Sequence, residues 1–334
     1  YSAVASLDAQ GRSSIVRNGI GEILTPSVVW FEDSEIIVGK EAKKVAVLHP
    51  DQVAECAKRD VGKTSYSKLI RGEQIPPEVI QACILRQLKD DALAQLGSDI
   101  KVVITVPAYF DEPRRKATLH AGEMAGLDVL DIVNEPTAAA LSFGESLGYL
   151  SAHGDALQPM KVLVYDLGGG TFDVTVIELK PGDIRTLATD GDVRLGGRDW
   201  DETLVEHVAR AFMTQHGSDP RENPATLAAI YAAVEEAKHT LSLRSRATVP
   251  VQHAGKFLEV SITAEQFQEL TEPLLERTAL TTRQVLAAGC VGYFVQITGQ
   301  CVQYFGRNGE IHTEWSPGAA GQREAHVESI KMQR

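Results

Sequence analysis

The chain of 334 residues lacks the features that mark several special classes of protein. Its four cysteines form no C-x-x-C pair, which argues against a zinc site and a dense disulfide framework and favours a reducing compartment. No apolar run approaches the roughly 18 residues of a membrane-spanning helix, and residues 1–4 form neither a basic leader nor a hydrophobic signal core. We therefore expect a cytoplasmic protein without a membrane segment.

Positive charge is also scarce, because 33 Lys and Arg stand against 45 Asp and Glu, for a formal net charge of −12. Such a chain is poorly suited to neutralising a phosphate backbone over a broad surface, so we expect no nucleic-acid partner. The negative net charge does not exclude a single small phosphorylated ligand, because backbone amides, a metal ion and one lysine can hold it. Hydrophobic residues at 43% are ordinary for a packed protein, and the length favours two domains.

Strand and helix signals alternate along the first 150 residues, which predicts an α/β fold. The expected strands lie at residues 3–7, 14–16, 27–31, 101–106 and 129–133. The expected helices, which begin at prolines and end near glycines, lie at residues 76–96, 113–124 and 136–144. Residues 101–106 (KVVITV) are nearly all β-branched, which is typical of a strand covered on both faces.

A loose stretch of Gly, Ser, His and Pro at residues 148–159 is where we place a boundary between two lobes. Beyond it we expect strands at 162–165 and 172–179, helices at 201–216 and 225–242, and a polar hairpin at 247–262. Thr263 and Gln266 form a capping-box signature that begins another helix. After Ala288 no sustained period appears, and residues 305–324 have the composition of a loop. The predicted division is a first lobe at 1–150, a second lobe at 151–288 and a divergent tail at 289–334, whose residues from Gly289 onward we expect to be expendable.

One segment, residues 166–173 (DLGGGTFD), carries the clearest chemical signal. A carboxylate at the end of a buried strand, followed by three glycines that allow positive φ and close backbone approach, suits a phosphate and its divalent cation. Asp166 could hold Mg²⁺ through water, Thr171 could donate to a phosphate oxygen, and Asp173 could orient water or metal. Spacing alone leaves a plain glycine-rich hairpin turn as an equal alternative.

Four strings together resemble the nucleotide-binding domain of the 70-kDa heat-shock, or DnaK-type, chaperone family. They are residues 104–110 (ITVPAYF), 134–140 (NEPTAAA), 164–173 (VYDLGGGTFD) and 196–201 (GGRDWD). The resemblance covers about residues 1–288 and implies the actin-like ATPase fold, which is ribonuclease H-like: two lobes, each with a central mixed sheet flanked by helices, and nucleotide in the cleft between them. It implies a cytoplasmic chaperone that hydrolyses ATP to ADP with Mg²⁺ and works with a J-domain co-chaperone and a nucleotide exchange factor.

The resemblance also implies roles for individual residues. Catalytic roles fall on Lys58, Glu135, Asp166, Thr171 and Asp173, with Mg²⁺ held by Asp166 through water. Nucleotide contacts fall on Gly168, Gly169, Gly170, Thr171, Gly196, Gly197, Glu235, Lys238, His239 and Ser242, where His239 replaces an arginine of many relatives. Pro107 and Arg115 match a switch that relays the nucleotide state between lobes. Without the family, Lys58 is an ordinary solvated lysine, Glu235 to Ser242 the solvated face of a helix, Pro107 a strand stop and Arg115 a surface charge.

The sequence also departs from the family pattern. The 334 residues contain no first phosphate loop of the form G-I-D-L-G-T-T, and residues 289–334 contain no G-G-[ST]-x-R-[ML]-P segment. We also expect no room in this chain for the family's peptide-binding domain. We therefore expect a fold incomplete at both ends, with weak ATP binding and slow hydrolysis. The alternatives are a non-catalytic pseudo-ATPase fragment and, less favoured, an actin-like-fold kinase.

Overall fold

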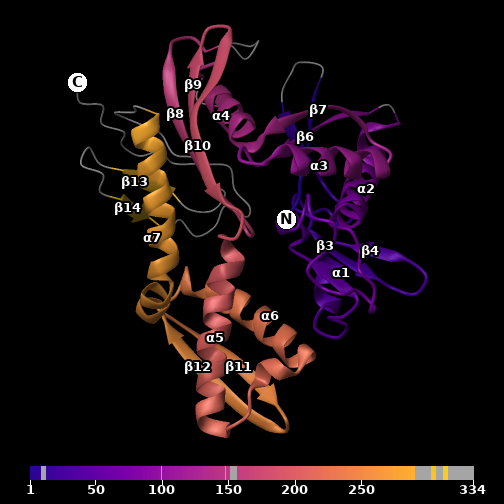
Figure 1. Cartoon of the computed structure of the whole chain (residues 1–334), viewed down its shortest axis with the longest axis vertical. Coiled ribbons are helices and arrows are strands. Elements are labelled where there is room, and N and C mark those ends of the chain that lie inside the picture. Colours follow the sequence, from indigo (N-terminus) through magenta and orange to yellow (C-terminus); the bar gives the residue numbers. More distant parts are fainter. Residues whose placement is uncertain are drawn as a thin grey trace.

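The computed structural model describes residues 1–8, 13–98, 100–146, 148–150, 156–289, 302–305 and 311–314. Helices and strands alternate along the chain, which confirms the predicted α/β class (Figure 1). Within these ranges no helix is both long and apolar enough to cross a membrane. We refer to residues 1–150 as the N-terminal half and to residues 156–289 as the C-terminal half.

The N-terminal half combines short antiparallel sheets with one parallel strand pair. Its strands are β1 (Val4–Leu7), β2 (Ser13–Val16), β3 (Val28–Phe31), β4 (Ile36–Val38), β5 (Val53–Glu55), β6 (Lys101–Val106) and β7 (Asp128–Asn134). Its α-helices are α1 (Lys40–Val45), α2 (Pro77–Leu96), α3 (Glu112–Met124) and α4 (Glu135–Ser146), and a short 3-10 helix spans Ala57–Arg59. β1 pairs with β2, β3 lies between β4 and β5, and β6 runs parallel to β7.

Strand β6 does not have the two covered faces that its sequence predicts. Burial alternates along the strand, and Val103 is 51% exposed. In the described part of the chain β6 pairs with β7 alone, and α3 packs on one face, where Gly122 lies against Val129 and Ile104. The β-branched run therefore reflects the preference of these residues for a pleated strand, rather than burial on both sides.

The C-terminal half begins with an antiparallel sheet in the order β10-β9-β8. Its strands are β8 (Met160–Leu167), β9 (Phe172–Lys180), β10 (Asp183–Asp192), β11 (Arg246–His253) and β12 (Lys256–Thr263). Its helices are α5 (Gly197–His216), α6 (Pro224–Leu241) and α7 (Ala264–Ala288), with a 3-10 helix at Pro220–Glu222. One core cluster lies between α5, α6, β11, β12 and the start of α7, and its buried members all fall within residues 204–267. Figure 1 shows this unit at one end of the half and the β8 to β10 sheet at the other.

The two halves share packed residues around α4. Ala140 of α4 lies in one core cluster with Val162 and Val164 of β8 and with Ile177 of β9. Figure 1 shows α4 beside the three-stranded sheet. The division into lobes at residue 150 stays a prediction, and residues 151–155 lie outside the described ones.

The predicted tail needs two corrections. Gly289 is buried, and a Cβ placed on it would lie 3.1 Å from Val176, so this residue packs with the C-terminal half. The segment expected to be loop contains a strand, because β14 (Ile311–Glu314) pairs antiparallel with β13 (Val302–Phe305). Each of these strands is only four residues long, which is too short to produce a sustained period in the sequence. The rest of the predicted tail lies outside the described residues.

Candidate active site

The segment DLGGGTFD forms the hairpin between β8 and β9. Asp166 pairs opposite Asp173, which leaves residues 168–171, here called the GGGT loop, to connect the strands. Gly168 donates its amide to the carbonyl of Thr171 at 2.9 Å. None of the three glycines has a positive φ, so the loop does not use the left-handed backbone that glycine allows. The local structure is therefore a glycine-rich hairpin turn, and binding of a phosphate by this turn stays a prediction.

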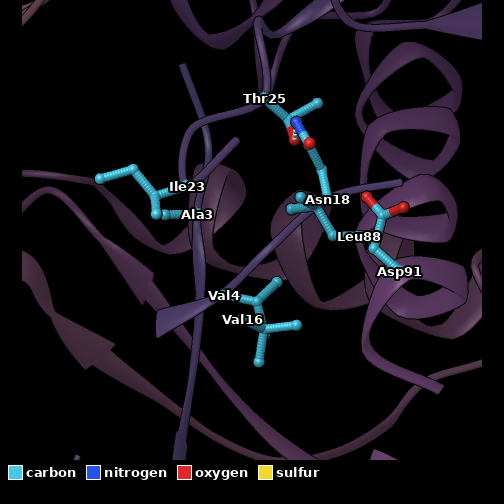
Figure 2. Close-up of a pocket in the computed structure, with 8 residues that line it drawn as sticks. All are labelled: Ala3, Val4, Val16, Asn18, Ile23, Thr25, Leu88 and Asp91. Carbon is cyan, nitrogen blue, oxygen red and sulfur yellow. Dashed lines mark hydrogen bonds between the residues drawn. The ribbon is translucent and has the colours of Figure 1, made fainter. Parts of the chain in front are cut away.

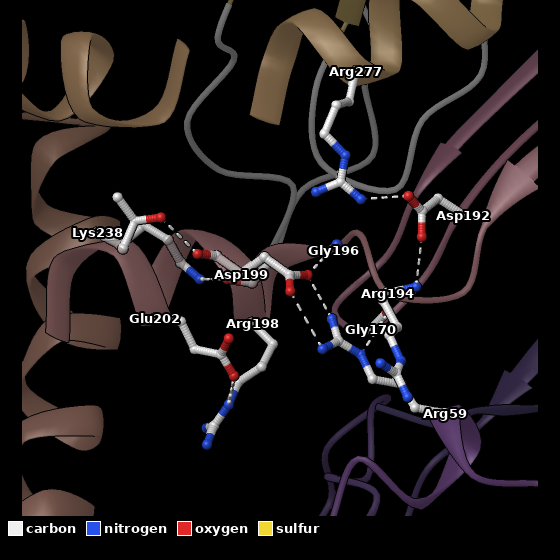
Figure 3. Close-up of polar contacts among 12 residues, drawn as sticks. Arg59, Gly170, Asp192, Arg194, Gly196, Arg198, Asp199, Glu202, Lys238 and Arg277 are labelled. Carbon is white, nitrogen blue, oxygen red and sulfur yellow. Dashed lines mark hydrogen bonds and ion pairs between the residues drawn. The ribbon is translucent and has the colours of Figure 1, made fainter. Parts of the chain in front are cut away.

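The glycines matter because a second loop packs directly on the first. This GGR loop (residues 196–198) donates the amides of Gly197 and Arg198 to the carbonyls of Gly168 and Gly169, both at 2.9 Å. A Cβ on Gly196 would stand 2.7 Å from the amide nitrogen of Gly170, a distance that real side chains do not adopt. Close approach between two backbones therefore explains the two predicted glycine strings, and Figure 3 shows them side by side.

Four of the predicted catalytic residues form one electrostatic group. Lys58 of the 3-10 helix pairs with Glu135, the first residue of α4, with 2.7 Å between Nζ and Oε1. Burial, the charge of Glu135 and the charge of Asp166 raise the pKa of Asp173 to about 8, and Lys58 opposes that rise. Burial and Glu135 likewise raise the pKa of Asp166, again against Lys58. Three carboxylates thus share one lysine.

Tyr109 also belongs to this group, and no motif predicted a role for it. A Cβ on Gly191 would lie 2.6 Å from the tyrosine ring, and Gly191 pairs opposite Asp173 across β9 and β10. Both carboxylate oxygens of Asp173 are buried without a hydrogen-bond partner among the described residues, and the buried hydroxyl of Tyr109 interacts with the side chain of Thr171. Burial and the Asp173 charge raise the pKa of Tyr109. Buried polar atoms of this kind normally bind water, an ion or a ligand.

A divalent cation fits this arrangement. Excess carboxylate charge and the unpartnered oxygens of Asp173 are what a hard cation neutralises. No three His, Cys, Asp or Glu side chains of the described residues lie close enough to ligate an ion together. An ion held by Asp166 through water stays a prediction.

The predicted nucleoside contacts lie on α6 and its C-terminal end, and they do not all reach the glycine loops. Lys238 does reach them: its Nζ lies 2.6 Å from Asp201 and donates to the carbonyl of Gly197 at 3.1 Å. Ser242 donates to the carbonyl of Lys238 at 3.2 Å. Glu235 instead pairs with Lys43 of α1 at 2.7 Å, across the two halves. His239, which the resemblance also assigns to the nucleoside, is exposed.

Arg115 supports the residue that precedes Glu135. Its guanidinium donates to the carbonyls of Phe110 at 3.0 Å and Ala108 at 3.3 Å, and to the side chain of Asn134 at 2.6 Å. It therefore connects the turn after β6 with the start of α4. The alternative interpretation, a surface helix charge, does not account for these three hydrogen bonds, and a relay through buried Pro107 stays a prediction.

A separate hollow does not compete with this site. Figure 2 shows it between β1, the turn at residues 18–25 and α2, with Asn18 and Asp91 on its wall. Its volume of about 10 Å³ has room for little more than one water molecule. It contains none of the predicted site residues, so the glycine loops and their carboxylates remain the candidate site.

Comparison with known proteins agrees with the motifs and the geometry. The family model described as Hsp70 protein matches residues 1–71 and 65–292. The chaperone protein DnaK of Halobacterium salinarum is 44% identical over 279 residues, which cover 81% of this chain and 43% of that protein. The chaperone protein DnaK of Thermotoga neapolitana is 42% identical over 294 residues, covering 85% and 48% respectively. The chain spans less than half the length of these curated relatives, and it belongs to the Hsp70 family.

Proposed function

We propose that the chain is an ATP-binding and ATP-hydrolysing domain of a DnaK-type chaperone. The observation that carries the proposal is the packing of the GGGT and GGR loops beside Lys58, Glu135, Asp166 and Asp173. Membership of the Hsp70 family supports the same activity. The chaperone function belongs to relatives more than twice as long, so it is part of the proposal.

Each part of the site has a role in this proposal. Amides of the GGGT loop and the hydroxyl of Thr171 bind phosphate oxygens. Lys58 contacts the terminal phosphate and the attacking water, and Asp173 orients that water and accepts its proton. Glu235, Lys238, His239 and Ser242 contact the nucleoside. Mg²⁺, when bound, offsets negative charge on the phosphates, and Asp166 would hold it through water.

The proposal extends to the organisation of the chain. Residues 1–150 and 151–288 would be two lobes with the nucleotide between them, which the ion pair of Lys43 with Glu235 and the charge interaction of Lys58 with Asp173 support. By family, a J-domain co-chaperone and a nucleotide exchange factor would be partners. The low cysteine content and the family support a cytoplasmic location.

Asp166→Asn tests the nucleotide site. Calorimetric titration with ATP should show tighter binding with Mg²⁺ than without it in the unmutated chain, and the variant should lose that difference while its fold is kept. Asp183→Asn, an exposed carboxylate on β10 of the same sheet, is the matched control and should behave like the unmutated chain. Equal affinity with and without Mg²⁺ in the unmutated chain would refute the assignment of Asp166.

Phosphate release in a single turnover separates hydrolysis from binding. The unmutated chain should release phosphate from bound ATP, because the site contains both a lysine for the phosphate and a carboxylate for the water. Binding without phosphate release would replace the proposed ATPase by a nucleotide-binding pseudo-ATPase. Absence of binding would refute the whole proposal.

A further inference from the structure

Arg59 reaches from the N-terminal half to both glycine loops of the C-terminal half. Its Nε donates to the carbonyl of Gly170 at 2.8 Å. Its two terminal nitrogens donate to the two carboxylate oxygens of Asp199, at 3.3 Å for Nη1 and 2.5 Å for Nη2. Figure 3 shows the guanidinium between these two partners. One planar side chain thus makes three directed hydrogen bonds across the halves.

The position of this guanidinium makes its contacts strong. The side chains of Arg59 and Asp199 are only 16% and 15% exposed, so water screens the pair little. Bidentate pairing of arginine with a carboxylate is geometrically specific, and lysine cannot reproduce it. Gly170 offers no side chain here, and a Cβ at that position would lie 3.6 Å from Nε.

Asp199 connects Arg59 to the GGR loop. Its Oδ2 also accepts the amide of Gly196 at 2.7 Å, at the start of α5. The GGR loop that begins there is in turn bonded to the GGGT loop through the carbonyls of Gly168 and Gly169. Arg59 therefore binds the GGGT loop directly and the GGR loop through Asp199.

We propose that Arg59 is a positioning residue, which holds the GGGT and GGR loops in the arrangement that binds phosphate and fastens them to the turn that contains Lys58. This role rests on the proposed function. When the hydrogen bonds of Arg59 to Gly170 and Asp199 are intact, the loops stay ordered, and bound nucleotide dissociates slowly. Without it, the glycine loops lose their connection to the N-terminal half, and Lys58 loses its fixed position opposite them, since both basic residues share one 3-10 helix.

The rival interpretation is an ion pair with a structural role only. Such a pair can contribute little net stability, because desolvation offsets the attraction of the charges. The two interpretations differ in what they change. A structural pair alters the melting temperature, whereas a positioning residue alters loop exchange and nucleotide release at temperatures where every variant is folded.

Amide hydrogen exchange on the nucleotide-free chain is the first test. In Arg59→Ala, peptides covering residues 166–174 and 194–200 should exchange faster by about tenfold or more, as expected for loss of charge-assisted bonds. Arg59→Lys should show a smaller increase, because an ammonium can still approach Asp199. The control is Arg210→Ala, which removes an exposed ion pair with Glu206 on α5 and should leave both loops unchanged.

Nucleotide release is the second test. Dissociation of a fluorescent ADP analogue with Mg²⁺, followed by stopped flow, should be about tenfold faster in Arg59→Ala and intermediate in Arg59→Lys. Asp199→Asn keeps an acceptor for Gly196 but loses the charge, and it should also speed release. Because Arg59 and Asp199 act through one contact, the variant with both Arg59→Ala and Asp199→Asn should release nucleotide hardly faster than Arg59→Ala alone.

The outcomes are distinct. The inference is overturned if folded Arg59→Ala matches the unmutated chain in both the hydrogen exchange of the loops and the rate of nucleotide release. It is also overturned if the effects of Arg59→Ala and Asp199→Asn on release are additive. Faster loop exchange with unchanged release would show that the loops depend on Arg59 but the nucleotide does not, which also overturns it. An unmutated chain that binds no nucleotide would refute the proposed function, while hydrogen exchange still decides whether Arg59 holds the loops.

Discussion

Asp173→Asn should stabilise the protein, and the gain should grow as the pH rises from 5 to 8. The side chain of Asp173 is 1% exposed, and its oxygens have no hydrogen-bond partner among the described residues. Burial and the neighbouring carboxylates raise its pKa to about 8. Asparagine has nearly the same shape and no charge at any of these pH values, so the substitution removes the cost of ionising a buried group.

The direction in which pH changes the free energy of unfolding follows from proton linkage. The unfolded carboxyl titrates near 3.8, so between that pH and about 8 the folded state binds more protons than the unfolded one. The free energy of unfolding therefore falls as the pH rises through this window, and it levels off above it. From pH 5 to pH 8 this group alone costs about 3 to 4 kcal/mol, at about 1.4 kcal/mol per pH unit.

Thermal unfolding of the nucleotide-free chain at pH 5, 6, 7 and 8 measures this cost. The difference in Tm between Asp173→Asn and the unmutated chain should widen by on the order of 5 °C across the range. Asp183→Asn, on an exposed part of the same sheet, should show a constant difference. A difference for Asp173→Asn that does not change with pH, or a variant less stable than the unmutated chain at pH 8, would refute the reasoning.

Three further predictions concern the same site. Gly196→Ala should lower stability by about 2 kcal/mol or more, because its Cβ would enter the neighbouring backbone, whereas Gly169→Ala, with nothing within 4 Å, should cost far less in a denaturant titration. Lys58→Ala should reduce the rate of single-turnover hydrolysis about a hundredfold and affect nucleotide binding less, because Lys58, the ion-pair partner of Glu135, is proposed to contact the terminal phosphate and the attacking water. A normal rate of hydrolysis would contradict that role. Tyr109→Phe removes a buried hydroxyl whose described partner is the side chain of Thr171, so Tm should fall by no more than about 4 °C, as expected for roughly 1 kcal/mol from one hydrogen bond, and a larger fall would mean that the hydroxyl also binds a structural water.

Local signals predicted many of the elements well. Helix α2 begins at Pro77 and is followed by Gly97, whose φ of 90° no other residue adopts easily. The capping box is present as expected, since Gln266 donates its amide to Thr263 Oγ1 at 3.2 Å and accepts from the Thr263 amide at 3.0 Å. These features depend on residues within a few positions of one another, which is why sequence alone reveals them.

Other features depend on partners outside their own segment, some of them far along the chain. Strand β10 (DIRTLATDGD) is polar and largely exposed, and it is a strand because β9 pairs with it. The family resemblance assigns roles to Lys58, Glu135 and the glycines, but it does not show that Arg59 meets Asp199, 140 positions away, or that Tyr109 lies against Gly191. Tertiary contacts of this kind have no signature in spacing or periodicity.

The core cluster confined to residues 204–267 has a consequence for how the chain folds. All of its buried members come from one continuous segment, so its contacts close short loops and lose little chain entropy. Low contact order of this kind favours early and rapid formation, before the long-range contacts between the halves. We expect protection in pulse-labelled refolding to emerge first in α5, α6, β11 and β12, and the β8 to β10 sheet to gain protection only when α4 docks against it.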